Sequence, residues 1–392
     1  MRRTAGRRPV SRRKKQPKTI QYFDYSLLAT IIFLVCFGLV ILYSTSAYSA
    51  QEKFGDPMWY FRKQAIITVG SLIVMAIVSR INYHVYARFA KLSYVVAFIL
   101  MLLILTPFGI EANGARRWVG FPDTPLQIQP AEVVKIAVIL YIPFLVCRTG
   151  KYIEKWDHLK EILIYGGAAG IGVLILTDNL SSAIIVLGIT AIILYVSYPK
   201  TKEIVQYSML AGIVGYIGVR IWASSLAKSD NFRLQRIIVW IDPEKYAGNK
   251  GFQTLQALYA IGSGGFFGKG LGASTQKMII PEVQNDMILS IICEELGVFG
   301  AIVVLVMFGM MLYRLMFIAQ NAPDKYGSLI VTGIFAHIAI QVILNVAVVT
   351  NLIPNTGITL PFISYGGTSI LFLMIEMGMA LSVSRSIRFD ES

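Results

Sequence analysis

The chain has 392 residues, of which 55% are hydrophobic and only 15% are charged. Apolar runs of about 18 residues or more recur along it, and this is the length that crosses the hydrocarbon core of a bilayer. Such a composition excludes a soluble globular domain. A membrane β-barrel is excluded as well, because its strands are shorter and alternate between apolar and polar residues. The sequence therefore predicts an all-α polytopic membrane protein.

The net charge of +14 is concentrated at the N-terminus, where the first 18 residues carry nine Lys or Arg side chains and no acid. A segment of this charge could bind nucleic acid. Its position just before the first apolar run is more typical of a disordered cytoplasmic tail that orients the protein and contacts anionic membrane lipid. We therefore expect a basic tail over residues 1–21, a membrane domain over 22–390, and no nucleic-acid partner.

About ten transmembrane helices are predicted. The first run is too long for a cleavable signal peptide and is interpreted as a retained span. The eighth is longer than a bilayer needs, so part of it should project or tilt. In chain order the ten predicted spans are 25–46, 64–81, 92–109, 131–148, 161–177, 182–198, 203–226, 286–318, 327–350 and 361–385.

Lys and Arg residues of the short loops fall consistently on one side of these spans. The positive-inside rule places that side, and with it both termini, in the cytoplasm. The longest loop, residues 227–285 between the seventh and eighth spans, then lies outside. Its seven cations suit an anionic ligand such as a diphosphate, or are ordinary solvated charges.

Acids that lie in or beside membrane spans are the first candidates for chemistry, because a charge in a bilayer is costly. Asp286 stands where the long loop re-enters the membrane, so water can reach it while its proton affinity is tuned by low dielectric. Glu294 and Glu295 lie deeper on the same predicted span and are expected to be structural partners of groups inside the bundle. Glu376 lies in the last span.

A mixed-charge cluster is predicted near the outer face. Glu132 and Lys135 are three residues apart at the start of the fourth span and can face each other. Arg116 and Arg117 come from the loop before it. The cluster can form part of a binding site or a structural ion-pair network.

Three polar residues follow one face of the ninth span. His337, Gln341 and Asn345 recur at intervals of four, which draws one stripe along a helix. Such a stripe either joins helices through hydrogen bonds or lines a water path.

The glycine-rich segment 262–272 resembles a phosphate-binding loop but lacks its spacing, since Ser263 and Gly270 occupy positions that the motif assigns to Gly and to Ser or Thr. A flexible hinge, or backbone that approaches a lipid diphosphate beside Lys269, suits it better. No metal-ligand spacing is present among the three cysteines or elsewhere.

Four stretches of the sequence are distinctive: NGARRW at 113–118 with QPAEVVK at 129–135, GFQTLQ at 251–256 with AIGSGG at 260–265, PEVQND at 281–286 with EELG at 294–297, and PNTG at 354–357 with LPFISYGGTS at 360–369. With these stretches the chain resembles the SEDS family of polytopic peptidoglycan glycosyltransferases (FtsW, RodA and SpoVE). The resemblance spans residues 22–390 in order, and the residues of the third and fourth stretches favour the FtsW and SpoVE branch.

The resemblance implies polymerisation of lipid II, an undecaprenyl-diphosphate disaccharide-pentapeptide, onto a nascent glycan strand in the cell membrane. It places the family's essential outer acid on Asp286 and implies that Arg116, Glu132 and Lys135 line one cavity. It also implies a class B penicillin-binding protein and other divisome or sporulation proteins as partners. After the fifth span this chain has Asp178-Asn179 where the family usually has Pro-Asp.

The proposed chemistry needs a general base, for which Asp286 is our candidate, and cations that stabilise the departing diphosphate. Arg116, Arg117, Lys135 and Lys269 are candidates for the latter. A divalent metal could share that task, although the sequence shows no ligand set. A lipid II flippase or transporter, and a scaffold without catalytic activity, remain alternatives.

Overall fold

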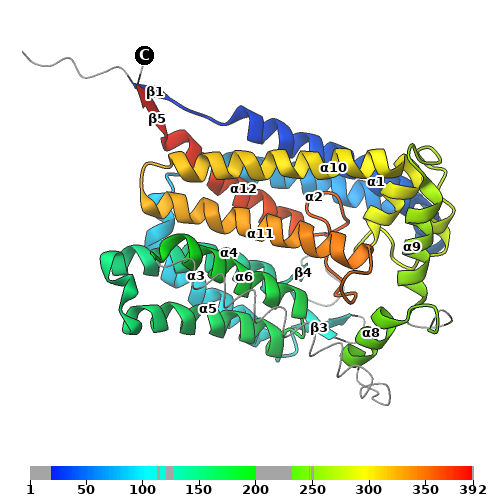
Figure 1. Cartoon of the computed structure of the whole chain (residues 1–392), viewed down its shortest axis with the longest axis horizontal. Coiled ribbons are helices and arrows are strands. Elements are labelled where there is room, and N and C mark those ends of the chain that lie inside the picture. The colour runs from blue at the N-terminus through cyan, green and yellow to red at the C-terminus, as the bar shows by residue number, and fades with distance from the viewer. Residues whose placement is uncertain are drawn as a thin grey trace, which may run out of the picture.

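The computed structural model describes residues 19–112, 115–120, 127–199, 232–246, 248 and 251–390. The predicted seventh span and nearly all of the basic tail lie outside these residues. Within them, helices run side by side along the long axis of the molecule (Figure 1). The predicted all-α membrane fold is confirmed, and the chain is a multi-pass membrane protein.

Nine helices in the described part of the chain are long and apolar enough to cross a membrane. Several begin where a short polar side chain caps the free N–H groups of the first turn. Asp24 accepts from Leu27 N at 2.8 Å, and Asp324 accepts from Gly327 N at 2.8 Å. The nine are α1 (Tyr25–Phe54), α2 (Trp59–Val78), α3 (His84–Leu103), α4 (Pro130–Thr149), α5 (Trp156–Leu176), α6 (Leu180–Ser197), α10 (Ile288–Asn321), α11 (Lys325–Val349) and α12 (Ser369–Ser386).

Helices α4 and α11 form the centre of the bundle, whereas α2 and α3 lie at its surface. Buried residues make up 78% and 72% of the most apolar windows of α4 and α11, but only 22% in α2 and in α3. The exposed residues of α2 and α3 are largely apolar, as expected for helices that face lipid. The polar side chains of α4 and α11 are therefore held in the protein interior.

The two described ends of the chain meet at one end of the bundle. Strand β1 (Thr19–Gln21) pairs antiparallel with β5 (Arg388–Asp390). Beside this pair, Asp24 accepts from Arg314 at 2.7 Å, and its backbone N–H donates to the Ser384 hydroxyl. The opposite end gathers the strands β3 (Ala115–Gly120) and β4 (Gln127–Ile128) and the helices α8 (Phe232–Ile241) and α9 (Phe252–Gly264) (Figure 1).

Both long segments predicted to lie outside the membrane hold more structure than the sequence predicts. The segment predicted as a loop over 227–285 contains α8 (Phe232–Ile241), α9 (Phe252–Gly264) and the short 3₁₀ helix η3 (Gln276–Met278). The segment before α4 forms an antiparallel sheet of β2 (Gly109–Ala112), β3 (Ala115–Gly120) and β4 (Gln127–Ile128).

One predicted helix start is wrong and one predicted helix is kinked, both for local backbone reasons. Helix α12 begins at Ser369 and not at residue 361, because Phe362 and Gly367 adopt left-handed conformations with φ of 63° and 50°. Helix α10 is interrupted at Gly297, where φ is 71°. The predicted long eighth span is thus two helical pieces joined at a kink.

Candidate active site

A cavity of about 400 Å³ lies at the end of the bundle away from the chain termini, among α4, α6, α11 and the loop that joins α11 to α12. Its charged lining consists of Lys63, Arg117, Glu132 and Lys135, so cations outnumber acids. Asn179, Ser181, Gln341 and Asn285 are among its neutral polar residues. An anion in contact with water and several donors fits this lining.

The pair of Glu132 and Lys135 predicted at the start of α4 is present, and it continues into the bundle. Glu132 and Lys135 form an ion pair of 2.7 Å across one turn of α4. Lys135 Nζ lies 3.1 Å from His337 Nε2, and His337 Nδ1 lies 2.7 Å from Glu376 Oε2. Lys135, His337 and Glu376 are at most 2% exposed, and Glu132 is 7% exposed. Four titratable side chains therefore run in series from the cavity into the core.

The two neighbours of the His337 ring suit one tautomer of the imidazole. When the Glu376 carboxylate accepts, His337 Nδ1 carries the proton and Nε2 of a neutral ring accepts from the ammonium of Lys135. Lys135 is thereby held between Glu132 and His337. Its ammonium group is therefore held in place at the inner wall of the cavity.

The polar stripe on α11 both joins segments and lines the cavity. Gln341 is a lining residue, and its amide donates to Thr359 O at 3.0 Å. Asn345 donates to Ile358 O at 2.7 Å and to Asp286 O at 3.0 Å. The stripe thus holds the backbone of the loop after α11 and of Asp286 in fixed positions.

Asp286 lies two residues before α10 and is half-buried. Its Oδ1 accepts from Gln253 Nε2 at 3.2 Å, and Asn355 donates to the same side chain. Burial raises the pKa of Asp286 above its ordinary value, while these hydrogen bonds and the charge of Arg236 oppose that shift. Asp286 does not line the cavity, but its sequence neighbour Asn285 does, and Asn355, which contacts its carboxyl group, directly precedes the lining residue Thr356.

The two arginines of β3 have different surroundings. Arg117 lines the cavity and donates to Asp178 O at 3.2 Å. Arg116 is exposed, does not line the cavity, and lies 3.8 Å from Glu111. Successive residues of a strand point to opposite faces, so only one of the two can face inward. The expectation that Arg116 lines the same cavity as Glu132 and Lys135 is not what the structure shows.

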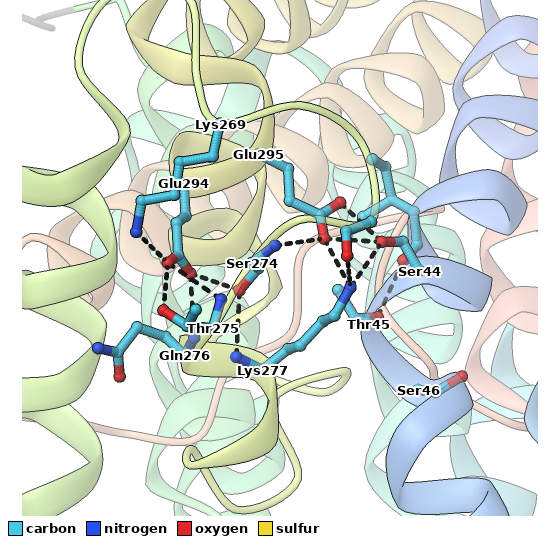
Figure 2. Close-up of polar contacts among 12 residues, drawn as sticks. Ser44, Thr45, Ser46, Lys269, Ser274, Thr275, Gln276, Lys277, Glu294 and Glu295 are labelled. Carbon is cyan, nitrogen blue, oxygen red and sulfur yellow. Dashed lines mark hydrogen bonds and ion pairs between the residues drawn. The ribbon is translucent and has the colours of Figure 1, made fainter.

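Lys269 does not reach the cavity either. Its ammonium lies 2.7 Å from Glu294 and 2.9 Å from the Ser263 hydroxyl. Figure 2 shows Glu294 surrounded by Lys269, Ser274, Thr275 and Gln276. A substrate-binding role for Lys269 would require this cluster to open.

Glu295 belongs to a second, adjacent cluster. It accepts from Lys277 at 3.0 Å and from the Ser44 hydroxyl of α1 at 2.7 Å (Figure 2). Both Glu294 and Glu295 are fully buried and fully partnered by groups of neighbouring segments. The geometry agrees with the structural role predicted for them.

Two glycines of 262–272, Gly264 and Gly268, serve close packing. A Cβ on Gly264 would collide with the backbone of Cys293, and a Cβ on Gly268 with that of Glu295. The backbone N–H of Lys269 donates to Glu294 O at 2.9 Å. The segment therefore lies against the kink of α10, and the prediction of a flexible hinge or of a lipid-diphosphate contact is not supported.

Several cavity residues were not singled out from the sequence. Lys63 precedes the predicted second span and Thr356 lies in a loop, and nothing in their local pattern marks either as part of a site. Gln253 and Asn355 reach Asp286 only because α9 and the loop after α11 meet there. In the described ranges no three His, Cys, Asp or Glu side chains gather as a metal site would require.

Residues 25–388 match the model of a family described as cell cycle protein, which comprises FtsW, RodA and SpoVE. The chain belongs to this SEDS family. The resemblance drawn from the four sequence stretches is thereby confirmed.

Curated SEDS relatives cover almost the whole chain. Stage V sporulation protein E of Bacillus subtilis is 34% identical over 93% of this chain and 98% of its own. The probable peptidoglycan glycosyltransferase FtsW of the same organism is 35% identical over 96% and 94%. The protein of that name from Geobacter sp. strain M18 is 32% identical over 95% and 99%.

Two solved structures share the fold. A chain from a peptidoglycan synthase complex superposes with a TM-score of 0.73 at 23% identity, covering 93% of this chain and 98% of its own. The rod shape determining protein RodA of Thermus thermophilus gives a TM-score of 0.67 at 24% identity, covering 93% and 97%. The arrangement of spans is therefore that of SEDS proteins.

The departure at 178–179 has a local explanation in this SEDS fold. Asn179 lines the cavity, and its side-chain oxygen caps α6 by accepting from Ser182 N at 3.0 Å. An amide oxygen caps a helix about as well as a carboxylate does. The cap is preserved, whereas the negative charge that an aspartate would bring to the cavity is absent.

Proposed function

We propose that this protein is a peptidoglycan glycosyltransferase that polymerises lipid II into glycan strands. Relatives of nearly the same length are named for this activity. The observation that carries the proposal is a half-buried acid, Asp286, beside a cavity whose charged lining is mostly cationic. This is the pairing of base and anion site that transfer from a lipid diphosphate requires.

Asp286 acts as the general base. An acceptor sugar hydroxyl attacks the anomeric carbon of the donor and gives its proton to the carboxylate. The bond from that carbon to the diphosphate breaks, and its electron pair leaves with the lipid diphosphate. A carboxyl group whose pKa is raised by burial holds the proton better than an exposed one, which favours this transfer at neutral pH.

Arg117 and Lys135 stabilise the charge that develops on the departing diphosphate. Both line the cavity, and Lys135 is held in place by Glu132 and His337. A guanidinium can bind two phosphate oxygens at once, while an ammonium acts as a point charge. Preorganised cations of this kind need no rearrangement when the charge appears.

The reaction takes place at the outer face of the cell membrane, with both termini in the cytoplasm. Support comes from the basic short loops and from the position of β1 and β5, at the end opposite the cavity (Figure 1). A class B penicillin-binding protein is the proposed partner, acting on the glycan that this protein releases. One structural relative was solved as part of a peptidoglycan synthase complex.

Purified protein and labelled lipid II test the proposal. Glycan chains resolved by electrophoresis are expected, and they must disappear with Asp286→Asn. Reconstituted vesicles distinguish the alternatives, because a flippase changes the accessibility of labelled lipid II without forming polymer. If neither polymer nor transport is observed with protein that is folded by thermal-unfolding criteria, the protein is a scaffold and the proposal is wrong.

A further inference from the structure

A second cavity, of about 430 Å³, lies at the opposite end of the bundle, beside the paired chain termini. Three segments far apart in the sequence form its walls: the connection from β1 into α1, the end of α2, and the end of α12. The proposed polymerase chemistry makes no use of it. Its lining consists of Gln21, Tyr22, Phe23, Tyr25, Ala76, Ser79, Arg80 and Arg385.

The lining contains two arginines and no acid. Asp24, whose position in the sequence is between the lining residues Phe23 and Tyr25, is fully buried and already paired with Arg314 at 2.7 Å. No ion pair of Arg80 or Arg385 occurs within the described ranges. The cavity therefore keeps its positive charge, and a guanidinium without a carboxylate partner is suited to phosphate oxygens.

The lining residue Arg80 follows an exposed apolar face of α2. Ile66, Val69, Ile73 and Ile77 are each more than half exposed and follow one face of α2 toward Arg80. Across the cavity, Tyr25 at the start of α1 is 73% exposed. A ligand here would have an apolar surface beside its tail and two cations at its head.

We propose that this cavity binds the headgroup of an anionic phospholipid from the leaflet on the side of the termini. Arg80 and Arg385 hold the phosphate oxygens, and the acyl chains lie along the exposed face of α2. The side-chain amide of Gln21 donates to Arg385 O at 2.8 Å, which ties the strand pair to the end of α12 that carries this arginine. Residues 1–18 come directly before β1 in the sequence, and their nine cations attract the same lipids at longer range.

The experiment uses the full-length protein, purified in detergent, stripped of lipid and titrated with dioleoyl-phosphatidylglycerol or dioleoyl-phosphatidylcholine. Native mass spectrometry counts the bound lipids. The variant Arg80→Gln/Arg385→Gln removes both cations of the cavity. The matched control Arg88→Gln/Lys91→Gln removes two exposed cations from α3 near the same end and leaves the cavity and the basic tail intact.

Wild-type protein is expected to bind one phosphatidylglycerol at least about tenfold more tightly than phosphatidylcholine, given the contribution of each surface cation. The cavity variant should lose that preference, and the control should keep it. Equal losses in both variants would mean nonspecific attraction by net charge and would overturn the proposal. A wild-type protein without preference would overturn it as well.

A second variant and a second ligand complete the test. Ala76→Trp fills the cavity without changing its charge and should also abolish the preference, which keeps the proposal testable if the double arginine variant does not fold. Inorganic phosphate at the same concentration should neither displace the bound phosphatidylglycerol nor raise the melting temperature. If it does either as effectively as the lipid, the ligand is a free phosphate and the lipid assignment is wrong.

Discussion

Asp286 is held by groups that come from three separate parts of the chain. Gln253 of α9 and Asn355 of the loop after α11 reach its carboxyl group, and Asn345 of α11 fixes its backbone. None of these contacts neutralises it with a directly bonded cation. A carboxyl group in this setting can change its protonation state without breaking an ion pair, as a general base must.

Asp286→Asn is expected to reduce lipid II polymerisation by about 10²-fold or more, which is the usual contribution of a general base. Glu282→Gln is the matched control, because it removes one negative charge from an exposed residue of the same segment and should retain most activity. Initial rates with labelled lipid II measure both. Equal activities of the two variants would show that the base is another group.

The same substitution is expected to stabilise the folded protein at neutral pH. Burial raises the pKa of Asp286 in the folded state, so its ionisation opposes folding once the pH exceeds the pKa of an unfolded aspartate. This penalty is absent at low pH, grows as the pH rises through the unfolded and then the folded pKa, and is constant above both. Melting temperatures of wild type and Asp286→Asn should therefore separate with rising pH and converge in acid. Convergence at neutral pH would contradict a raised pKa.

Lys135→Met should destabilise the protein by about 3–5 kcal/mol, because it leaves the buried Glu132 carboxylate without its partner. The double variant Glu132→Gln/Lys135→Met should recover much of that loss. Thermal unfolding in one detergent measures all three proteins. A double variant no more stable than the single one would mean that Glu132 is solvated when Lys135 is removed.

Among the elements, α10 has a kink at which the membrane bundle meets the loop after α9. The loop after α9 lies against the break at Gly297. Hydrogen bonds of Glu294 connect α10 to η3, and those of Glu295 connect α10 to α1 (Figure 2). Buried acids with several partners cost little when every partner is present and much when one is lost. The position of α9, and with it that of Gln253, depends on this joint.

Gly297→Ala tests the joint. Its φ of 71° is strained for any residue with a Cβ, and the new atom would meet the backbone of Phe266 and Gly268. We expect a loss of more than about 2 kcal/mol in unfolding free energy. Gly309→Ala, in the same helix but with open space around it, should change stability by less than about 1 kcal/mol. Similar melting temperatures for the two variants would show that the kink tolerates a Cβ.

At the scale of the whole molecule, the two cavities lie at opposite ends of one bundle. The cationic cavity beside Asp286 lies where α8, α9 and β3 gather, and the second lies beside the paired termini (Figure 1). The orientation of the molecule in the membrane therefore decides on which side of the membrane each cavity lies.

Cysteine labelling tests that orientation. In a variant without Cys36, Cys147 and Cys293, a membrane-impermeant maleimide should label Lys245→Cys in intact spheroplasts. Lys325→Cys, at the other end of the bundle, should react only after permeabilisation. Both positions are exposed, so accessibility depends on the side of the membrane alone. The reverse pattern would invert the orientation and exclude the proposed function.

Properties that depend on local periodicity and composition could be predicted from the sequence alone. The lengths of the apolar runs predicted the nine spans found in the described residues. The spacing of Glu132 and Lys135 predicted their ion pair. The stripe of α11 was visible for the same reason, because residues four apart share a helix face. Residue-level resemblance also identified the SEDS family.

Only the tertiary structure decided which residues meet across the chain. Lys135 contacts His337 from 202 positions away, Arg117 and not Arg116 faces the cavity, and Lys269 is bound to Glu294. The second cavity combines residues near 21, 80 and 385. Such contacts depend on how helices are rotated and shifted against one another. A repeat along one helix sets the direction of its own side chains but leaves the choice of neighbour open.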